Sequence, residues 1–199
     1  AEEIARAVGY NNINPKELDF KIDHSKNNKI CADGEDNIRN ILIHNGFFEV
    51  INDPFVPCGD HSSIKVDNPL DSNRRFMRQT LKESLLENLL YNERRQKDSI
   101  KLFEIANIYS SENKDGKKFL GIIASGRIDK NFKDFTKFID ENYLSNLLGK
   151  YLNNDYELNI VKIFSKQINS KSKKPILYLE FELNSSFKID YEIETFGQD

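Results

Sequence analysis

The sequence predicts an α+β fold, in which a mostly antiparallel sheet is flanked by helices. Residues 99–109 carry apolar side chains on both alternating faces, which predicts an interior strand, and a turn at 113–116 leads into a returning strand at 119–125. Just before them, leucines recur at helical spacing over 79–95. Strands joined by hairpins, without regular β-α-β units, favour an antiparallel sheet over a parallel one.

The first residues, 2–8, are predicted to end a helix that Gly9 stops, because glycine readily adopts the left-handed backbone found after helices. This helix has no capping residue in front of it, so we expect the protein to continue upstream. Residues 11–29 are polar and contain Asn-Asn and Asn-Pro pairs, which predicts a connector.

The next elements are a helix over 35–45 that ends at Gly46, and a strand over 47–56 rich in aromatic and β-branched residues. Pro54 lies inside that strand and predicts a sheet edge or a bend, since proline cannot donate a hydrogen bond to a neighbouring strand. Residues 62–66 are predicted to form a short strand.

The helix over 79–95 has the clearest pattern in the chain, since its leucines form one stripe with charged residues facing away. The stripe consists of Leu81, Leu85, Leu86, Leu89 and Leu90. Further along, we expect a helical region over 132–151, a strand over 155–164 and a basic loop over 167–174. Apolar and polar residues then alternate over 177–183, which predicts a half-buried strand.

Composition limits the possible functions. Hydrophobic residues make up 38% of the chain and charged residues 31%, which is typical of a globular protein rather than a disordered one. A net charge of −3 argues against a protein whose main function is to bind the phosphates of nucleic acids. The basic clusters at 74–78, 94–95 and 171–174 are therefore interpreted as solvated surface, with a minor contact to nucleic acid left open.

Membrane and redox signals point to the cytoplasm. The chain has no apolar run of about 20 residues, as a membrane-spanning helix needs, and no secretion signal at its start. Its two cysteines, Cys31 and Cys58, form neither a C-x-x-C pair nor a disulfide framework. We expect a cytoplasmic protein with no membrane contact.

Motifs for independent catalysis are missing from the sequence. The three histidines, His24, His44 and His61, lack partners at the spacing of metal ligands. The run from Cys58 to His61 contains a nucleophile and a base, but residues this close in sequence rarely converge, so we interpret it as an ordinary loop. The glycine-rich phosphate-binding motifs are absent.

Three blocks of the sequence carry a resemblance to a known family. The first reads E-E-I-A-R-A-V-G-Y-N-N-I at 2–13, and the second is the helix and strand at 38–56, with G-F-F-E-V-I at its centre. The third begins N-P-L at 68–70 and continues through M-R at 77–78 to L-F-E-I at 102–105. Together they resemble the β subunit of bacterial phenylalanyl-tRNA synthetase. The likeness thins after about residue 125.

Two departures from the family pattern concern single positions. A glycine usual in the family after the Phe-Glu-Ile strand is Ala106 here, and an Asp-Phe-Phe-Asp run is reduced to D-F-T at 134–136.

The resemblance implies a class II aminoacyl-tRNA synthetase-like core within a longer, multidomain subunit. By this likeness, residues 1–14 are the end of the preceding domain and a connector. Residues 15–199 are then the core. The resemblance further implies pairing with the catalytic α subunit in an α2β2 heterotetramer that binds tRNA.

The same resemblance predicts a core without chemistry. A class II active site holds ATP phosphates with arginines, whose planar fork binds phosphate oxygens in pairs. The strand at 102–105 has no arginine after its phenylalanine, Glu104 is expected to repel the nucleotide, and no arginine follows Arg127. We therefore expect no catalytic residues and no bound cofactor here, with ATP acting only through the α subunit.

One metal site is implied. Glu2 and Glu3 stand where the family places carboxylates that share Mg²⁺ with the α subunit, and oxygen ligands suit this ion. The carboxylates that would complete the set are absent from this chain, so the site is expected to be incomplete, and solvated surface glutamates are an equally good interpretation.

For contact with the α subunit we expect the helix at 35–45 and the strand at 47–56, with a second leucine face from the helix at 79–95. Some of the following side chains are expected to stay exposed there, the alternative being that all of them belong to the core: Ile41, Ile43, Phe47, Phe48, Leu86 and Leu90.

Two other functions remain open from the sequence. A class II paralogue could act as a regulatory or small-molecule-binding module, and phosphate-binding arginines would mark its catalytic form. A nucleic-acid-binding module would show salt-dependent affinity for tRNA.

Overall fold

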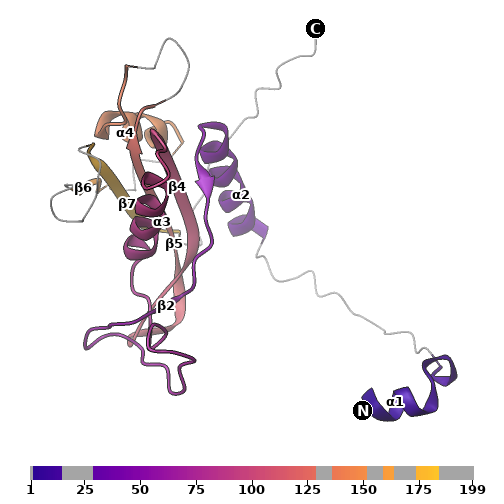
Figure 1. Ribbon diagram of the computed structural model, residues 1–199. Coiled ribbons are helices and arrows are strands. Elements are labelled where there is room, and N and C mark those ends of the chain that lie inside the picture. Colours follow the sequence, from indigo (N-terminus) through magenta and orange to yellow (C-terminus); the bar gives the residue numbers. More distant parts are fainter. Residues whose placement is uncertain (1, 15–28, 129–135, 152–158, 164–173, 184–199) are drawn as a thin grey trace, which may run out of the picture.

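The computed structural model describes residues 2–14, 29–128, 136–151, 159–163 and 174–183. Its main feature is a five-stranded sheet with the strand order β1-β4-β5-β7-β6, crossed by helices on both faces (Figure 1). Four of its strands pair in antiparallel fashion, and only β1 runs parallel to its neighbour. The predicted α+β class with a mostly antiparallel sheet is confirmed.

The centre of the sheet is a long hairpin, formed by β4 (Ser99–Ser110) and β5 (Asn113–Gly126). Strand β7 (Ile176–Glu182) pairs with β5, and the short β6 (Val161–Ile163) lies outside β7. On the opposite edge, β1 (Phe48–Glu49) lies beside β4. Strand β4 is therefore interior, as its two apolar faces predict.

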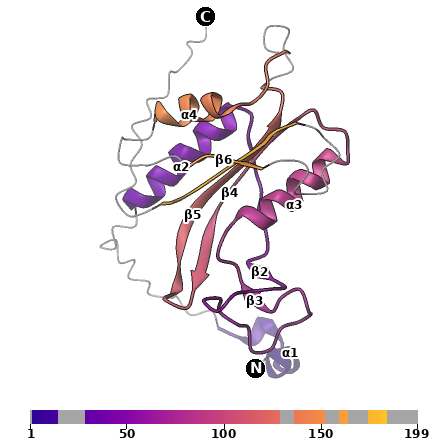
Figure 2. The ribbon, with the colours of Figure 1, turned by 90° about the vertical axis from the view of Figure 1, so that its left-hand side faces the viewer.

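The two faces of the sheet carry different helices (Figure 2). Helices α2 (Lys29–His44) and α4 (Glu141–Gly149) cover one face, where Ile41 and Leu144 pack with Phe103 of β4. Helix α3 (Lys82–Glu93) covers the other face through Leu85 and Leu89. Each fully buried leucine contributes about 1.5–3 kcal/mol by leaving water, so both faces are needed to hold the sheet.

Helix ends follow the glycines of the sequence. Helix α1 (Glu2–Val8) ends at Gly9, which has φ +87°, and a short 3₁₀ turn (Tyr10–Asn12) follows. Gly46, with φ +77°, terminates α2 in the same way. Helix α2 starts six residues earlier than predicted, so the connector expected over 11–29 is shorter, and its residues 15–28 lie outside the described part.

The strand predicted over 47–56 is wrong as one element. The chain forms β1, leaves the main sheet, and then forms β2 (Phe55–Val56), which pairs with β3 (Phe76–Met77) in a separate two-stranded sheet. Pro54 stands at the break, and its carbonyl accepts a hydrogen bond from Arg78 N. The strand predicted over 62–66 is reduced to one bridge between Lys65 and Phe76.

Two further predictions need correction in detail. The hairpin turn lies at 111–112, because Ser110 already pairs with Asn113. Gly116 instead sits in an irregularity of β5 with φ +81°, where its missing side chain leaves room for the Tyr109 ring. Strand β7 is buried on both faces rather than half-buried, since α3 covers the side that carries Tyr178.

The C-terminal predictions are met in part. Within 132–151, the described residues form α4, whose first turn is capped by Asp140 accepting a hydrogen bond from Tyr143 N at 2.7 Å. Within 155–164 they form β6, and most of the loop at 167–174 lies outside the described residues. None of the helices in the described part combines the length and apolar character needed to cross a bilayer.

Candidate functional site

A row of three residues crosses the sheet beneath α3, and we call it the acidic row: Glu104 of β4, Gly121 of β5 and Glu180 of β7. Glu104 pairs with Gly121, and Gly121 pairs with Glu180, so the three lie side by side. Glycine in the middle lets the helix approach, because a methyl group there would meet Leu85 Cδ1 at 2.8 Å. Helix α3 therefore rests directly on the sheet between two carboxylates.

The first carboxylate forms a buried ion pair. Glu104 Oε1 lies 2.7 Å from Nη1 of Arg78, and the two side chains are only 2% and 5% exposed. The guanidinium also donates through Nε to the carbonyl of Asn107 at 3.1 Å. A buried charge is tolerated only when paired and hydrogen-bonded, and these contacts meet that need for both partners.

Glu104 also accepts hydrogen bonds from Asn52, which a second asparagine connects to α3. Asn52 donates from its side chain to Oε2 at 2.7 Å and from its backbone to Oε1 at 3.3 Å. Asn88 of α3 in turn donates to the Asn52 side chain at 2.6 Å. The expectation that Glu104 repels a nucleotide is thus replaced by a different role: its charge is neutralised within the fold.

The second carboxylate organises the start of α3. Glu180 accepts from Leu81 N at 3.0 Å, from the Thr80 hydroxyl at 2.7 Å and from the Tyr178 hydroxyl at 2.6 Å. A negative charge near a helix N-terminus is favourable, because unpaired N–H groups concentrate there. Burial and the adjacent charge of Glu180 raise the pKa of Tyr178 well above its usual value of 10, so it stays a neutral donor.

The β4–β5 hairpin contains no arginine at all, from Ser99 to Gly126. Its cations are lysines, and one of them, Lys101, lies on the opposite face from the acidic row and contacts α4 through Tyr143. Arg78 is the guanidinium that reaches the acidic row, and it is engaged by Glu104 and Asn107. The interactions of Arg78 on this face therefore stabilise the fold rather than provide a phosphate-binding site.

The predicted metal residues lie on α1. Glu2 and Glu3 are both exposed, and Glu2 is bound to Arg6 at 2.7 Å. Adjacent helical positions point about 100° apart, so the two carboxylates leave the helix in different directions. Across the described ranges, no three His, Cys, Asp or Glu side chains are grouped so as to hold a metal. The two glutamates alone do not fit a complete magnesium site.

The loop from Cys58 to His61 is a hydrogen-bonded turn. Asp60 Oδ1 accepts from the backbone and the hydroxyl of Ser62, each at 2.8 Å, and from the Ser63 hydroxyl at 3.2 Å. The bonds from Ser62 lower the pKa of Asp60 below its usual value. The Asp60 carboxylate thus holds the turn, in keeping with the ordinary loop that was predicted.

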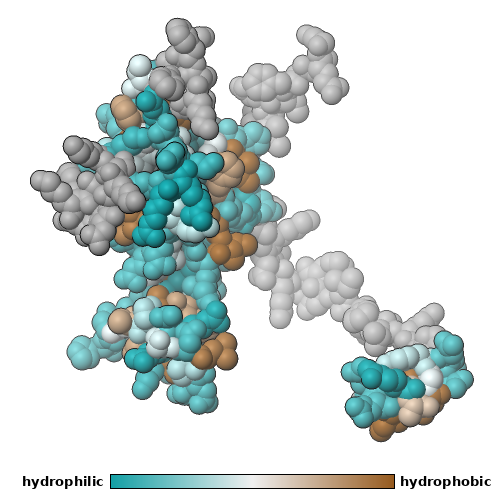
Figure 3. Space-filling model, viewed as in Figure 1, coloured by the Kyte–Doolittle hydropathy of each residue, from teal (hydrophilic) through white to brown (hydrophobic). Residues whose placement is uncertain are grey.

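The residues expected at a partner surface divide into three groups. Ile43 and Phe48 are exposed, Phe48 by 71%, while Leu86 and Leu90 are half-buried. Ile41 and Phe47 are buried between α2 and the sheet, so the exposed part of the predicted set does not include them. Figure 3 shows hydrophobic side chains at the surface beside α2.

Sequence reasoning missed Ile51, which at 94% is the most exposed large apolar residue among those that the structure describes. It was assigned to a continuous strand, whereas it lies in the stretch between β1 and β2. The signal was the run Asn52-Asp53-Pro54, which is typical of a turn and predicts that the preceding residue leaves the sheet.

Comparison with known proteins adds sequence evidence. Residues 24–153 match the family described as "Phenylalanyl tRNA synthetase beta chain CLM domain". The chain is 35% identical over 176 residues to the phenylalanine–tRNA ligase β subunit of Fusobacterium nucleatum subsp. nucleatum, which covers 79% of this chain and 22% of that protein. The β subunit of Buchnera aphidicola subsp. Acyrthosiphon pisum is 26% identical over 208 residues, covering 96% of this chain and 26% of that protein. The chain thus spans about a quarter of the length of these relatives.

Among solved structures, the pyrrolysyl-tRNA synthetase of Desulfitobacterium hafniense has a similar fold. The TM-score is 0.54 at 16% sequence identity, over 77% of this chain and 66% of that one. At this identity the likeness concerns the fold alone.

Proposed function

This chain belongs to the phenylalanyl-tRNA synthetase β chain family, and from that membership we propose that it is a non-catalytic core that pairs with the catalytic α subunit. In this proposal the α subunit binds ATP and attaches phenylalanine to tRNA. The present chain supports that reaction by completing the assembly, an α2β2 heterotetramer.

The observation that carries the proposal is the state of Arg78. A class II active site needs guanidinium groups that face the phosphates of ATP. Here the guanidinium beside the sheet is committed to Glu104 at 2.7 Å, and the hairpin below α3 provides carboxylates instead of arginines. A nucleotide phosphate that bound Arg78 would first have to break this buried ion pair, which costs several kcal/mol.

We further propose that residues 1–14 close a preceding domain and that 15–199 are the core. The match of the family to residues 24–153 supports a boundary between them. Exposed apolar side chains on 2–13, including Ile4 and Tyr10, support the first part, because such a stripe is normally covered by the rest of a domain.

For the pairing surface we propose the outer side of α2 and β1, where Ile43, Phe48 and Ile51 are exposed. Strand β1 is an edge strand with only two residues in the sheet. An exposed edge that carries large apolar side chains is a surface on which another chain can pack.

The magnesium proposal is narrower. Glu2 and Glu3 would contribute to a Mg²⁺ site only together with carboxylates from elsewhere in the complex, since the two alone form no complete ligand set. Their role would be to place negative oxygen atoms at the border between the core and the preceding domain.

The pairing is tested by measuring the affinity of the chain for its α subunit after the change Phe48→Ser. We expect affinity to fall at least about fivefold, because a buried interface aromatic contributes more than about 1 kcal/mol. Folding is expected to be unchanged, since Phe48 is largely exposed.

Leu70→Ser provides the control, because Leu70 is also highly exposed but lies in the loop between β2 and β3. Equal losses for the two variants, or failure of the unchanged chain to bind α at all, would contradict the proposed pairing.

A further inference from the structure

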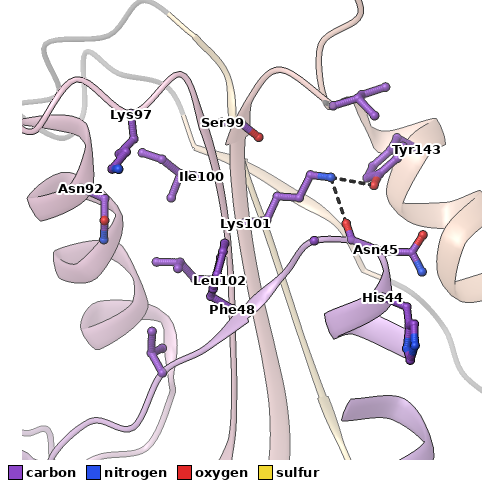
Figure 4. Close-up of a pocket in the computed structure, with 13 residues that line it drawn as sticks. His44, Asn45, Phe48, Asn92, Lys97, Ser99, Ile100, Lys101, Leu102 and Tyr143 are labelled. Atoms are coloured by element: carbon purple, nitrogen blue, oxygen red, sulfur yellow. Dashed lines mark hydrogen bonds between the residues drawn. The ribbon is translucent and has the colours of Figure 1, made fainter. Parts of the chain in front are cut away.

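Of the three exposed side chains on the proposed pairing surface, Ile51 is the one that lies outside a helix or strand. Ile43 belongs to α2 and Phe48 to β1, whereas Ile51 follows the end of β1 by two residues. Phe48 lines a pocket of about 890 Å³ at the end of α2, and the chain leaves the main sheet just beyond it (Figure 4). Ile51 is 94% exposed, so only contacts made by its neighbours in sequence can fix its position.

The residues on both sides of Ile51 are held by other elements. Val50 N donates to the carbonyl of Phe103 at 2.9 Å, and the Val50 side chain packs against the leucine cluster beneath α3. On the other side, Asn52 donates to Glu104 from its backbone at 3.3 Å and from its side chain at 2.7 Å. Two half-buried residues therefore flank a fully exposed one, and the backbone of Ile51 is held at both ends.

Asn88 of α3 fixes the orientation of the Asn52 amide. Asn88 Nδ2 donates to Asn52 Oδ1 at 2.6 Å, so the same amide donates to a residue of the sheet and accepts from the helix. Glu104 is itself held by the buried ion pair with Arg78 at 2.7 Å. A polar network in which each member has a partner makes the segment that it binds rigid.

A rigid, exposed isoleucine is well suited to binding another protein. Ile51 contributes little to the stability of this chain, because an apolar side chain stabilises a protein when it leaves water. A partner that covers Ile51 gains that burial. The segment also loses little conformational entropy on binding, because its backbone is already fixed.

We propose that Ile51 is a preformed anchor for the α subunit, and that Asn88 is the positioning residue that holds this anchor in place through Asn52. The inference rests on the proposed pairing, and it adds which side chain makes the central contact and what fixes it. The partner surface that fits is an apolar pocket, since the Ile51 side chain carries no polar group. The network around Glu104 thus serves assembly as well as the fold.

A double-mutant cycle on the affinity for the α subunit tests the proposal. The Kd is measured for the full-length subunit, for Ile51→Ser, for Asn88→Ala and for the double variant. We expect Ile51→Ser to raise the Kd at least about tenfold and Asn88→Ala to raise it about fivefold. In the Ile51→Ser background, Asn88→Ala should change the Kd less than about twofold, because the anchor that it positions is gone.

Asn92→Ala is the matched control for Asn88→Ala. Asn92 is a half-buried asparagine of the same helix, and its side chain donates to the backbone carbonyl of Asn88 at 2.9 Å. We expect this change to leave the Kd within about twofold of the unchanged value. Both variants should remain folded, because alanine has a higher helix propensity than asparagine.

Hydrogen exchange in the free subunit gives a measurement that does not depend on binding. The amide of Asn52 should exchange at least about tenfold faster in Asn88→Ala, because the segment that carries Ile51 is then held less firmly. Asn92→Ala should leave this exchange rate unchanged.

The outcomes separate this inference from the proposed function. The inference is overturned if Ile51→Ser leaves the Kd unchanged, if Asn88→Ala has the same effect with and without Ile51, or if Asn88→Ala does not speed exchange at Asn52. In these cases the unchanged subunit still binds α, so the pairing stands. If the unchanged subunit forms no complex with α, the proposed function fails and the anchor fails with it.

Discussion

Single residues decide what the sheet beneath α3 can do. The sequence has a glutamate at position 104, where a nucleotide-binding strand would need an arginine. The partner of Glu104 could not be predicted, because Arg78 is 26 residues away and reaches it only through the path of β3 and β4. Glu104, which was predicted to repel a nucleotide, instead forms an internal ion pair with Arg78.

Breaking this pair is expected to be costly. Arg78→Met leaves the carboxylate of Glu104 buried without its main counter-charge, so the free energy of unfolding should fall by about 3–5 kcal/mol. Urea unfolding of the chain measures this loss. Lys117→Met is the matched control, because Lys117 forms an exposed pair with Glu182 at 3.1 Å and should cost less than about 1 kcal/mol.

A double variant, Arg78→Met with Glu104→Leu, removes both charges and should recover much of the lost stability. If Arg78→Met costs no more than Lys117→Met, the pair is not the buried anchor described here.

Tyr178 makes stability depend on alkaline pH. Its pKa is raised in the folded chain, so above pH 10 the unfolded chain loses this proton first, and the free energy of unfolding falls by up to about 1.4 kcal/mol per pH unit. The contribution is complete below pH 10 and is lost above it. Tyr178→Phe lacks the titrating group, although it gives up a hydrogen bond worth about 1 kcal/mol.

The stability difference between the unchanged chain and Tyr178→Phe should therefore shrink as pH rises from 9 to 11. Urea unfolding at several pH values gives this difference, and a difference that stays constant would show that Tyr178 ionises normally.

At the scale of elements, long periodic segments were predictable and short ones were not. Strand β4 and helix α3 carry patterns over ten or more residues, and both form near their predicted positions. Residues 47–56 were predicted to form one strand because they favour an extended backbone. In the structure they contribute one strand to the main sheet and another to the two-stranded sheet. Local propensity cannot tell which sheet an extended residue joins, since pairing partners such as Phe76 and Leu102 lie far away in sequence.

The approach of α3 to the sheet should depend on Gly121. Gly121→Ala places a methyl group 2.8 Å from Leu85 Cδ1 and 3.0 Å from Leu81 Cβ, so the Leu85 side chain or the helix must move. We expect a loss of about 1–3 kcal/mol in the free energy of unfolding. Thermal or urea unfolding measures it.

Gly149→Ala is the comparison, because a methyl group at the last residue of α4 meets nothing within 4 Å. That change should leave stability unchanged or raise it by up to about 1 kcal/mol. Equal effects at the two glycines would show that α3 does not rest on the acidic row.

At the scale of the whole molecule, the sequence predicted the fold class and the family, but only part of the surface. Ile41 and Ile43 are two residues apart, so they lie on different sides of a helix, but the sequence does not say which side faces the sheet. In the structure Ile41 is buried and Ile43 is exposed. The pocket at the end of α2 is lined by residues of α2, β1, α3, β4 and α4, elements that no local pattern connects. Such surfaces form where elements distant in sequence pack together, so local sequence patterns do not predict them.

The most direct test of the account is phenylalanine-dependent exchange of pyrophosphate into ATP, measured for this chain alone and after addition of its α subunit. A core whose guanidinium is bound internally should give no exchange above background alone, while the mixture should be active. Exchange catalysed by the isolated chain would contradict the account, since it would require phosphate contacts that Arg78 cannot make while it holds Glu104.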